Sequence, residues 1–132
     1  MTWQDFEQEV AEFFRARGYD VKYNNELVGR SGVIHEIDIL AFNKKESIAC
    51  ECKSGNKKIT KHLIAEWESV CRDLPFKVKP AIASEAGFTY MGLLYAKAYD
   101  IMLITKSQHF PYQRLSHLEL VDFSEIEPSY EI

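Results

Sequence analysis

VIHEIDILAFNKKESIACECK, residues 33–53, is the stretch of sequence that decides the fold. Its apolar and polar side chains alternate, and because successive strand residues point to opposite faces, the alternation predicts two adjacent strands. The polar segment Asn43-Lys44-Lys45-Glu46 has the length of a hairpin loop between them. Four apolar residues of the first strand are expected to share one face: Val33, Ile37, Ile39 and Ala41.

The opposite faces of these two strands carry charged side chains. Glu36 and Asp38 lie on the first strand, while Glu51 and Lys53 lie on the second, pointing away from its apolar side. If the strands pair, Asp38, Glu51 and Lys53 converge on a single patch. Two carboxylates gathered beside an ammonium group suit phosphodiester cleavage assisted by Mg²⁺.

Composition places the chain among globular proteins. With 132 residues, 46% of them hydrophobic and 27% charged, it is expected to form one domain over residues 1–132. No apolar run approaches the roughly 20 residues of a membrane-spanning helix, so we expect no membrane partner. The N-terminus lacks the regions of a signal peptide, and three cysteines are an odd number for a disulfide framework. Both features favour the reducing cytoplasm.

Charge is distributed unevenly along the chain. The net charge is −4, but residues 115–132 hold five carboxylates and no lysine or arginine, which leaves residues 1–114 at +1. Residues 44–61 include six lysines and only two glutamates. A lysine cluster alone is most often a solvated loop, but next to paired carboxylates it favours contact with phosphates. The residues expected to bind nucleic acid are Lys44, Lys45, Lys57, Lys58 and Lys61.

An amphipathic first helix carries a carboxylate within its apolar stripe. Trp3, Val10 and Phe14 recur at helical spacing, Glu7 lies in the same row, and Gly18 predicts the end of the helix. A carboxylate on a buried stripe is costly unless it meets a cation or a metal. Glu7 therefore either approaches the charged patch or lies at the edge of the stripe and reaches solvent.

The rest of the chain alternates between helices and strands. Helices are predicted from a cap at Thr60 to Leu74 and from Phe88 to Tyr99. Their buried stripes are expected to be Leu63, Trp67, Val70, Cys71 and Leu74 in the first, and Met91, Leu94, Tyr95 and Ala98 in the second. We expect strands at 19–23, 80–84 and 101–105, loops at 24–26 and 109–112, and a strand or short helix at 115–123. This order predicts parallel or mixed pairing with helices on both faces.

The predicted charged patch has the ligands of a magnesium site. Hard oxygen ligands suit Mg²⁺, or Mn²⁺ in its place, better than zinc. Asp38 and Glu51 would hold the ion, the backbone carbonyl of Cys52 could add a ligand, and Glu7 could complete the shell. Lys53 could orient or deprotonate the attacking water, or stabilise the phosphorane, and these roles stay open. Glu36 lies either near this site or only beside it.

A helix followed by strands with Asp and Glu-x-Lys resembles the PD-(D/E)xK nuclease superfamily, particularly its Mrr-type restriction endonucleases and archaeal Holliday-junction resolvases. The matching segments are Phe6-Glu7, Gly18-Tyr19-Asp20-Val21, His35-Glu36-Ile37-Asp38-Ile39-Leu40, Glu51-Cys52-Lys53, Gly87-Phe88-Thr89 and residues 96–104. By this resemblance Glu7, Asp38, Glu51 and Lys53 correspond to the active-site positions of the family. Ile37 stands where the superfamily name has Pro, and Glu51 occupies a position that is Gln in many Mrr-like members.

The resemblance implies both a fold and an activity. The expected fold is α/β, a restriction-endonuclease-like three-layer domain with a central mixed sheet flanked by helices. The likeness covers about residues 3–105 and leaves an acidic extension over residues 106–132. The expected activity is Mg²⁺-dependent cleavage of DNA by an endonuclease. Because cutting both strands of a duplex needs two sites, a homodimer or a partner subunit is expected.

Two alternatives remain beside this interpretation. A zinc site would need Cys50, Cys52, Cys71 and a histidine, but strand alternation turns the first two thiols toward the core, which favours buried structural thiols. His35 falls on the apolar strand face and is expected to be a packed histidine. The second alternative is a nuclease-like module that binds nucleic acid or a protein partner without cutting, in which Asp38 and Lys53 form a structural ion pair.

Overall fold

A single mixed sheet of six strands forms the centre of the computed structural model, which describes residues 3–107 and 114–126. The strands follow one another in chain order across the sheet. The outer pairs β1–β2, β2–β3 and β5–β6 are antiparallel, whereas β3–β4 and β4–β5 are parallel. Their bounds are β1 Asp20–Val28, β2 Ile34–Phe42, β3 Ser47–Lys53, β4 Lys79–Ser84, β5 Met102–Ser107 and β6 Arg114–Leu120.

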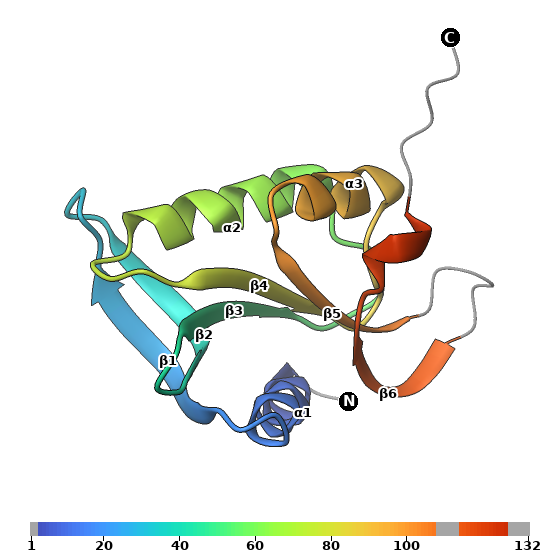
Figure 1. Cartoon of the computed structure of the whole chain (residues 1–132), viewed down its shortest axis with the longest axis horizontal. Coiled ribbons are helices and arrows are strands. Elements are labelled where there is room, and N and C mark those ends of the chain that lie inside the picture. The colour runs from blue at the N-terminus through green and yellow to red at the C-terminus, as the bar shows by residue number, and fades with distance from the viewer. Residues whose placement is uncertain (1–2, 108–113, 127–132) are drawn as a thin grey trace, which may run out of the picture.

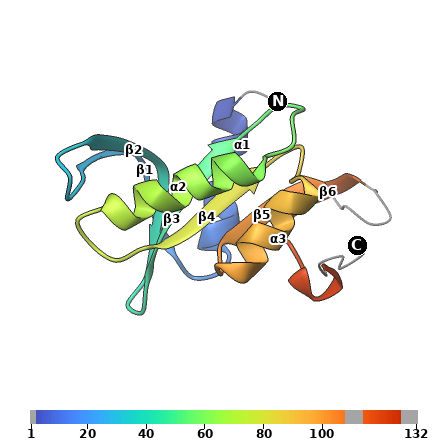
Figure 2. The same cartoon turned by 90° about the horizontal axis from the view of Figure 1, so that it is seen from above.

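Helices cover both faces of the sheet, as the sequence predicts. Helix α1 (Trp3–Arg15) lies below the sheet in Figure 1, and α2 (Lys61–Asp73) and α3 (Tyr90–Ala98) lie above it. Seen from above, α2 and α3 cross the strands next to each other (Figure 2). A short 3₁₀ turn, Phe123–Glu125, follows β6. No helix in the described ranges is long and apolar enough to cross a membrane.

Each helical layer has its own hydrophobic core. Phe6, Val10 and Phe14 of α1 pack against one face of the sheet. Trp67 of α2 packs on the other face and donates a hydrogen bond of 3.1 Å from its indole N–H to the Ala49 carbonyl. The Trp67 bond positions α2 directly over β3, the strand that carries Glu51 and Lys53.

The predicted cap of α2 forms, and one glycine in α3 allows close packing. The Thr60 hydroxyl accepts from the Leu63 N–H at the start of α2. In α3, a Cβ added to Gly92 would lie 3.0 Å from Ile64 Cδ1 and 3.2 Å from the Ile59 carbonyl oxygen. Gly92 therefore lets α3 approach α2 more closely than a side chain would permit.

Several local expectations are wrong. Strand β1 continues through residues 24–26, which were expected to form a loop, because β2 supplies backbone partners along almost its whole length. Leu63 and Met91 were expected to be buried, but they are 40% and 63% exposed. Residues 115–120, for which strand or helix was left open, belong to β6. The loop expected at 109–112 lies outside the described residues.

Candidate active site

Strands β2 and β3 separate at the point where the sequence predicts the charged patch. Their pairing extends from Phe42 and Ser47 to Ile39 and Cys50, and Asp38 follows directly beyond the last pair. The Asp38 carboxylate accepts a hydrogen bond of 2.9 Å from the Cys52 N–H through Oδ2. A side-chain oxygen thus takes the place of a strand partner, and we call this separation of β2 from β3 the fork.

The backbone at the fork changes which face β2 buries. Asn24 lies across from Asp38 in β1, between two regular strand pairs, and has a positive φ of 48°. Ile37 packs in the core beneath α2 and α3, whereas Ile39 and Ala41 pack against α1. The expectation that these three residues share one face is therefore wrong, because the strand irregularity at Asn24 and Asp38 interrupts the alternation.

Asp38 and Glu51 lie next to each other at the fork. Burial raises the pKa of Glu51 to about 8, together with a hydrogen bond and a charge interaction from Asp38. Lys53 acts in the opposite direction and lowers the pKa of Glu51, which indicates that its ammonium group also faces this carboxylate. The structure thus brings together the three residues that strand alternation predicts to converge.

A cleft of about 240 Å³ opens beside Glu51 and Lys53, between the sheet and α2. Glu36 lines it with them, and its charge raises the pKa values of both Glu7 and Glu51. Glu36 therefore belongs to the electrostatic environment of the site. Glu66 of α2 also lines the cleft and was missed from the sequence. Its helical spacing from Leu63 and Val70, which line the same cleft, is the signal that could have identified it.

Glu7 approaches the fork from α1. Only 6% of its surface is exposed, so of the two alternatives for this residue the buried one holds. Burial raises its pKa, and the charges of Asp38 and Glu36 raise it further. Among the described residues it has no cationic partner within ion-pair distance.

The cysteines and His35 have structural surroundings. All three cysteines are free thiols. The pKa of the Cys52 thiol lies well above its ordinary value, mainly because of a hydrogen bond with Cys50 and also because the thiol is buried. Burial raises the pKa of the Cys71 thiol to about 12. His35 Nε2 lies 2.7 Å from Asp73 Oδ2 of α2. These contacts fit the expected structural thiols and a packed histidine.

The donor atoms at the fork suit a hard divalent cation. Four carboxylates and a single lysine surround the fork: Glu7, Glu36, Asp38, Glu51 and Lys53. Asp38 and Glu36 raise the pKa values of Glu7 and Glu51, and a bound cation would relieve this repulsion. In the part of the chain that the structure describes, no three potential ligands are close enough to share one ion. Asp38 and Glu51 thus fit the two-carboxylate attachment of an ion such as Mg²⁺, which keeps several water ligands.

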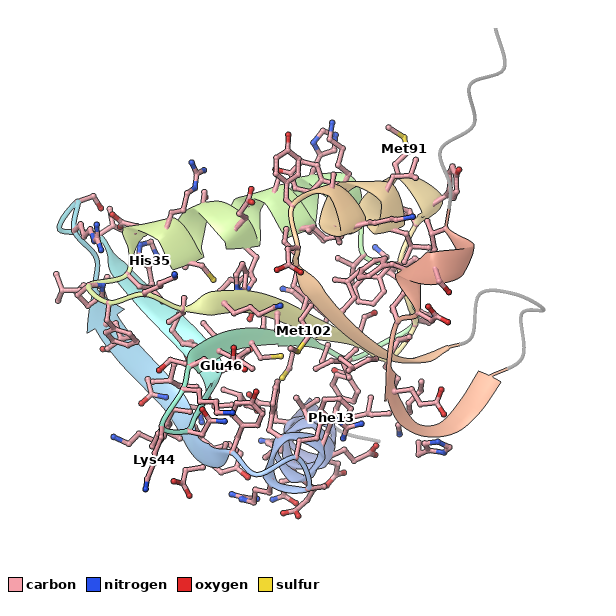
Figure 3. All side chains as sticks on the ribbon, in the orientation of Figure 1. Phe13, His35, Lys44, Glu46, Met91 and Met102 are labelled. Atoms are coloured by element: carbon pink, nitrogen blue, oxygen red, sulfur yellow. The ribbon has the colours of Figure 1, made fainter. Side chains whose placement is uncertain are left out.

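The lysines predicted to bind nucleic acid form two separate groups. Lys57 and Lys58 lie in the loop that joins the fork end of β3 to α2, and Lys61 begins α2, so these three lie toward the fork. Lys44 and Lys45 lie in the β2–β3 hairpin, at the other end of β3 and about 20 Å away at strand spacing. Figure 3 labels Lys44 at this hairpin and His35 near the opposite end of β2. The expectation that all five lysines lie beside the site is therefore wrong for Lys44 and Lys45.

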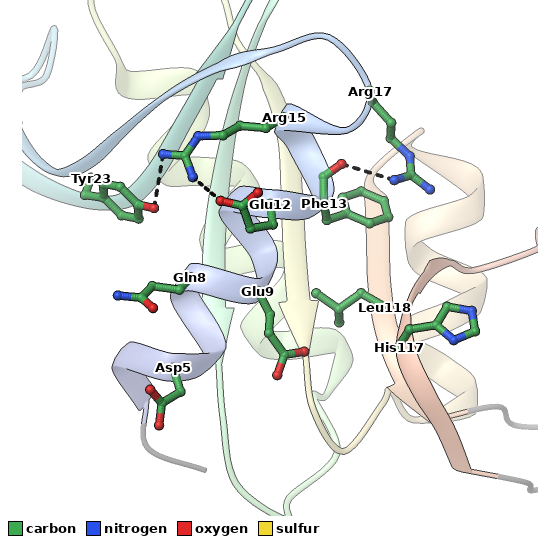
Figure 4. A pocket seen from close by; sticks show the side chains of 10 residues that line it. All are labelled: Asp5, Gln8, Glu9, Glu12, Phe13, Arg15, Arg17, Tyr23, His117 and Leu118. Atoms are coloured by element: carbon green, nitrogen blue, oxygen red, sulfur yellow. Dashed lines mark hydrogen bonds and ion pairs between the residues drawn. The ribbon is translucent and has the colours of Figure 1, made fainter.

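A larger hollow of about 870 Å³ lies between α1 and β6, and Figure 4 shows its lining. Arg15 pairs with Glu12 at 2.6 Å, and Arg17 donates to the Phe13 carbonyl at 3.1 Å. The predicted catalytic residues do not line this hollow. Two of its other charged side chains pair with residues outside the hollow, Glu9 with Lys106 and His117 with Glu119, each at 2.8 Å. The fork therefore remains the candidate active site.

Comparisons with known proteins agree with this fold. Residues 1–109 match the family profile Mrr_cat, described as restriction endonuclease. A crystal structure of a protein of unknown function, AF1548, matches with a TM-score of 0.67 and 24% sequence identity. The match covers 74% of this chain but only 56% of that protein, and at this identity it concerns the fold alone. No curated protein matches the chain.

Proposed function

This chain belongs to the Mrr-type restriction endonuclease family, within the PD-(D/E)xK nuclease superfamily, and we propose that it hydrolyses DNA phosphodiester bonds with a divalent metal ion. The family implies a nucleic-acid substrate. The observation that carries the proposal is the contact of Asp38 with Glu51, which helps to raise the pKa of Glu51 to about 8, beside Lys53. Clustered carboxylates destabilise a metal-free fold, and cation binding gives them a role.

The proposed roles follow from the surroundings of each side chain. Asp38, fixed through Oδ2 by the Cys52 N–H, and Glu51 are the proposed ligands, with the Cys52 carbonyl and Glu7 as further candidates. A bound Mg²⁺ would polarise the scissile phosphate and lower the pKa of a water. Lys53, exposed at the end of β3, can contact the phosphate or take a proton from the attacking water.

The wider surroundings complete the proposal. Lys57, Lys58 and Lys61 are proposed to contact the phosphates that flank the scissile bond. Two copies of the chain, or one copy and a partner subunit, would supply the two sites needed for a duplex. We propose a single domain over residues 1–132 and a cytoplasmic location, the latter because all three cysteines are free thiols.

The test is cleavage of supercoiled plasmid and of a four-way junction, with Mg²⁺, Mn²⁺ or EDTA. We expect metal-dependent nicking that Lys53→Ala abolishes. Lys22→Ala is the matched control, because Lys22 is an exposed strand lysine of β1. The preferred substrate would distinguish a restriction-like from a resolvase-like activity. Cleavage that survives in EDTA or in Lys53→Ala would contradict the proposal.

One observation favours a second candidate, a module that binds nucleic acid without cutting it. Within the described ranges, fewer than three potential ligands lie at the distance of a shared ion. DNA binding without cleavage at any metal concentration, unchanged in Asp38→Asn, would support this candidate.

A further inference from the structure

A surface hollow adjoins the β2–β3 hairpin, at the end of β3 away from the fork, and a second hollow lies beside it along the C-terminal half of α2. One has a volume of about 760 Å³ and the other about 430 Å³. Lys77, Val78, Pro80 and Tyr99 line both, so the two form a continuous depression. Its cationic residues, which we call the basic surface, are Arg30, Lys44, Lys45, Arg72, Lys77 and Lys79.

The basic surface has an excess of positive charge. Six cations line it against three carboxylates, a net charge of +3 on a chain whose total is −4. The carboxylates are engaged: Glu46 accepts from the Tyr19 hydroxyl, Glu68 accepts from the Tyr95 hydroxyl at 2.8 Å, and Asp100 pairs with Lys79 at 3.4 Å. Two of these contacts come from neutral hydroxyls and only Asp100 meets a cation, so the net excess of positive charge comes from the count of six cations to three carboxylates.

Three lysines of the basic surface have no ion-pair partner among the described residues. Lys44, Lys45 and Lys77 form no ion pair with any residue that the structure describes. All three are exposed, and they lie in the hairpin and in the loop before β4. Arg72, in the last turn of α2, also stabilises the negative end of the helix dipole, but these loop lysines have no such structural role. Their charges are available to an external anion.

Exposed aromatic rings lie among these cations. Tyr99 is 59% exposed and lines both hollows, while Phe76 is 37% exposed and lines the smaller one. The Tyr99 ring is supported by Tyr95, with 4.6 Å between ring centroids. A supported, exposed ring surrounded by lysines combines a stacking platform for a base with phosphate-binding groups.

We propose that the basic surface binds single-stranded nucleic acid at a site separate from the catalytic fork. Lys44, Lys45 and Lys77 contact successive phosphates, and Tyr99 stacks on an unpaired base. Single strands fit better than duplex because the bases of a duplex are stacked on one another and do not offer a free face to Tyr99. The inference rests on the proposed function in one respect, that the polyanion of this nuclease-family chain is nucleic acid.

The test is fluorescence anisotropy of the full chain in EDTA, with a labelled oligothymidylate of about 20 nucleotides and a duplex of equal length. Charge removal in Lys44→Gln/Lys77→Gln should weaken single-strand binding about tenfold. It should also reduce the slope of log Kd against log salt by about 1.4, because two phosphate contacts are lost. Arg15→Gln/Arg17→Gln is the matched control and should leave this slope unchanged, because these two exposed cations at the C-terminal end of α1 line neither the cleft at the fork nor the basic surface.

The stacking contact is tested separately at Tyr99. Tyr99→Ala should weaken oligothymidylate binding about tenfold, and Tyr99→Phe should retain it because the ring persists. If Lys44→Gln/Lys77→Gln weakens the binding of single strand and duplex equally, and Tyr99→Ala does not change either affinity, the single-strand assignment is overturned in favour of a duplex phosphate contact. Weaker oligothymidylate binding in Lys57→Gln/Lys58→Gln at the fork end, without any loss in Lys44→Gln/Lys77→Gln, would place the strand at the fork and overturn the basic surface as its site.

Binding in EDTA keeps this inference distinct from the proposed cleavage. Absence of cleavage, with oligothymidylate binding that depends on Lys44 and Lys77, would overturn the nuclease proposal and retain the inference. Metal-dependent cleavage, with strand binding unaffected by these lysines, would do the reverse.

Discussion

The two ends of strand β3 carry opposite chemistry. At its C-terminal end, Glu51 and Lys53 lie with Asp38 in the fork, where carboxylates are half-buried and hydrogen-bonded. At its N-terminal end, Lys44 and Lys45 extend from the hairpin into solvent. One strand of seven residues thus separates an acidic centre from a cationic surface.

This difference shows that burial decides how each group of charges acts. Carboxylates withdrawn from water perturb one another strongly at short range, which prepares a site for a cation and for proton transfer. Exposed lysines act over longer distances and are screened by salt, which suits capture of a polyanion. Variants at the two ends should therefore have separable effects.

The largest effect is expected for Asp38→Asn, which should slow DNA cleavage about 1,000-fold, on the scale of losing one electrostatic contact to a transition state. The asparagine oxygen can still accept from the Cys52 N–H, so the fork should keep its shape. Asp100→Asn at the basic end is the control and should leave the nicking rate of plasmid unchanged. Equal rates for Asp38→Asn and the unmodified chain would remove Asp38 from the site.

In EDTA, ionisation of Glu51 is expected to lower the free energy of unfolding by roughly 2–4 kcal/mol as the pH rises. Its pKa of about 8 in the folded chain exceeds the ordinary value of 4.5, so the folded chain binds more protons between these values. Stability should therefore be fully present below pH 4.5 and fall as the pH rises toward 8. Glu51→Gln should flatten this decline in urea unfolding measured across that range, whereas Asp100→Asn should not.

A smaller loss, about 1–3 kcal/mol, is expected for Gly29→Ala at the β1–β2 turn. An added Cβ would overlap the Asp73 carboxylate and lie 2.9 Å from the Asp73 backbone oxygen. A double-mutant cycle with Asp73→Ala checks the cause, because removing that carboxylate should recover part of the loss. Strictly additive unfolding energies would exclude the predicted clash.

The smallest effect concerns metal affinity in the absence of nucleic acid. Because Glu51 must lose its proton to bind a cation, Mg²⁺ affinity should rise about tenfold per pH unit up to pH 8 and then level off. Titration calorimetry at several pH values measures this dependence, with Lys77→Gln as a control from the basic end. An affinity independent of pH would place the ion away from Glu51.

Much of the fold follows from local patterns. The alternation at 33–53 predicts the β2–β3 hairpin, and Thr60 with its apolar run predicts α2. The extension of β1 through Asn24 and Asn25 escapes such patterns, because β2 compensates the poor strand propensity of these residues. The burial of Ile64 in place of Leu63 likewise depends on how α2 and α3 pack together.

The sequence was enough to predict which residues form the site, but less of their arrangement in space could be predicted. Strand alternation places Asp38, Glu51 and Lys53 on common faces, and helical spacing places Glu7 on the buried stripe. The interruption at Asn24 and Asp38 has no period that a sequence reveals. The distance between Lys44 and Lys57 follows from the length of β3 alone and could have been predicted. It was missed because the two lysines were grouped by their closeness in sequence.

Asp73 links the turn between β1 and β2 to the end of α2 through three side-chain contacts. Its carboxylate accepts from the Ser31 N–H and hydroxyl at 2.9 and 2.6 Å, and lies 2.7 Å from His35 Nε2. The turn and the last turn of α2 should therefore open to solvent as one cooperative unit. Since β2 leads from that unit directly to Asp38, the amide hydrogen-exchange rate of Ser31 becomes a reporter of how firmly the fork is held.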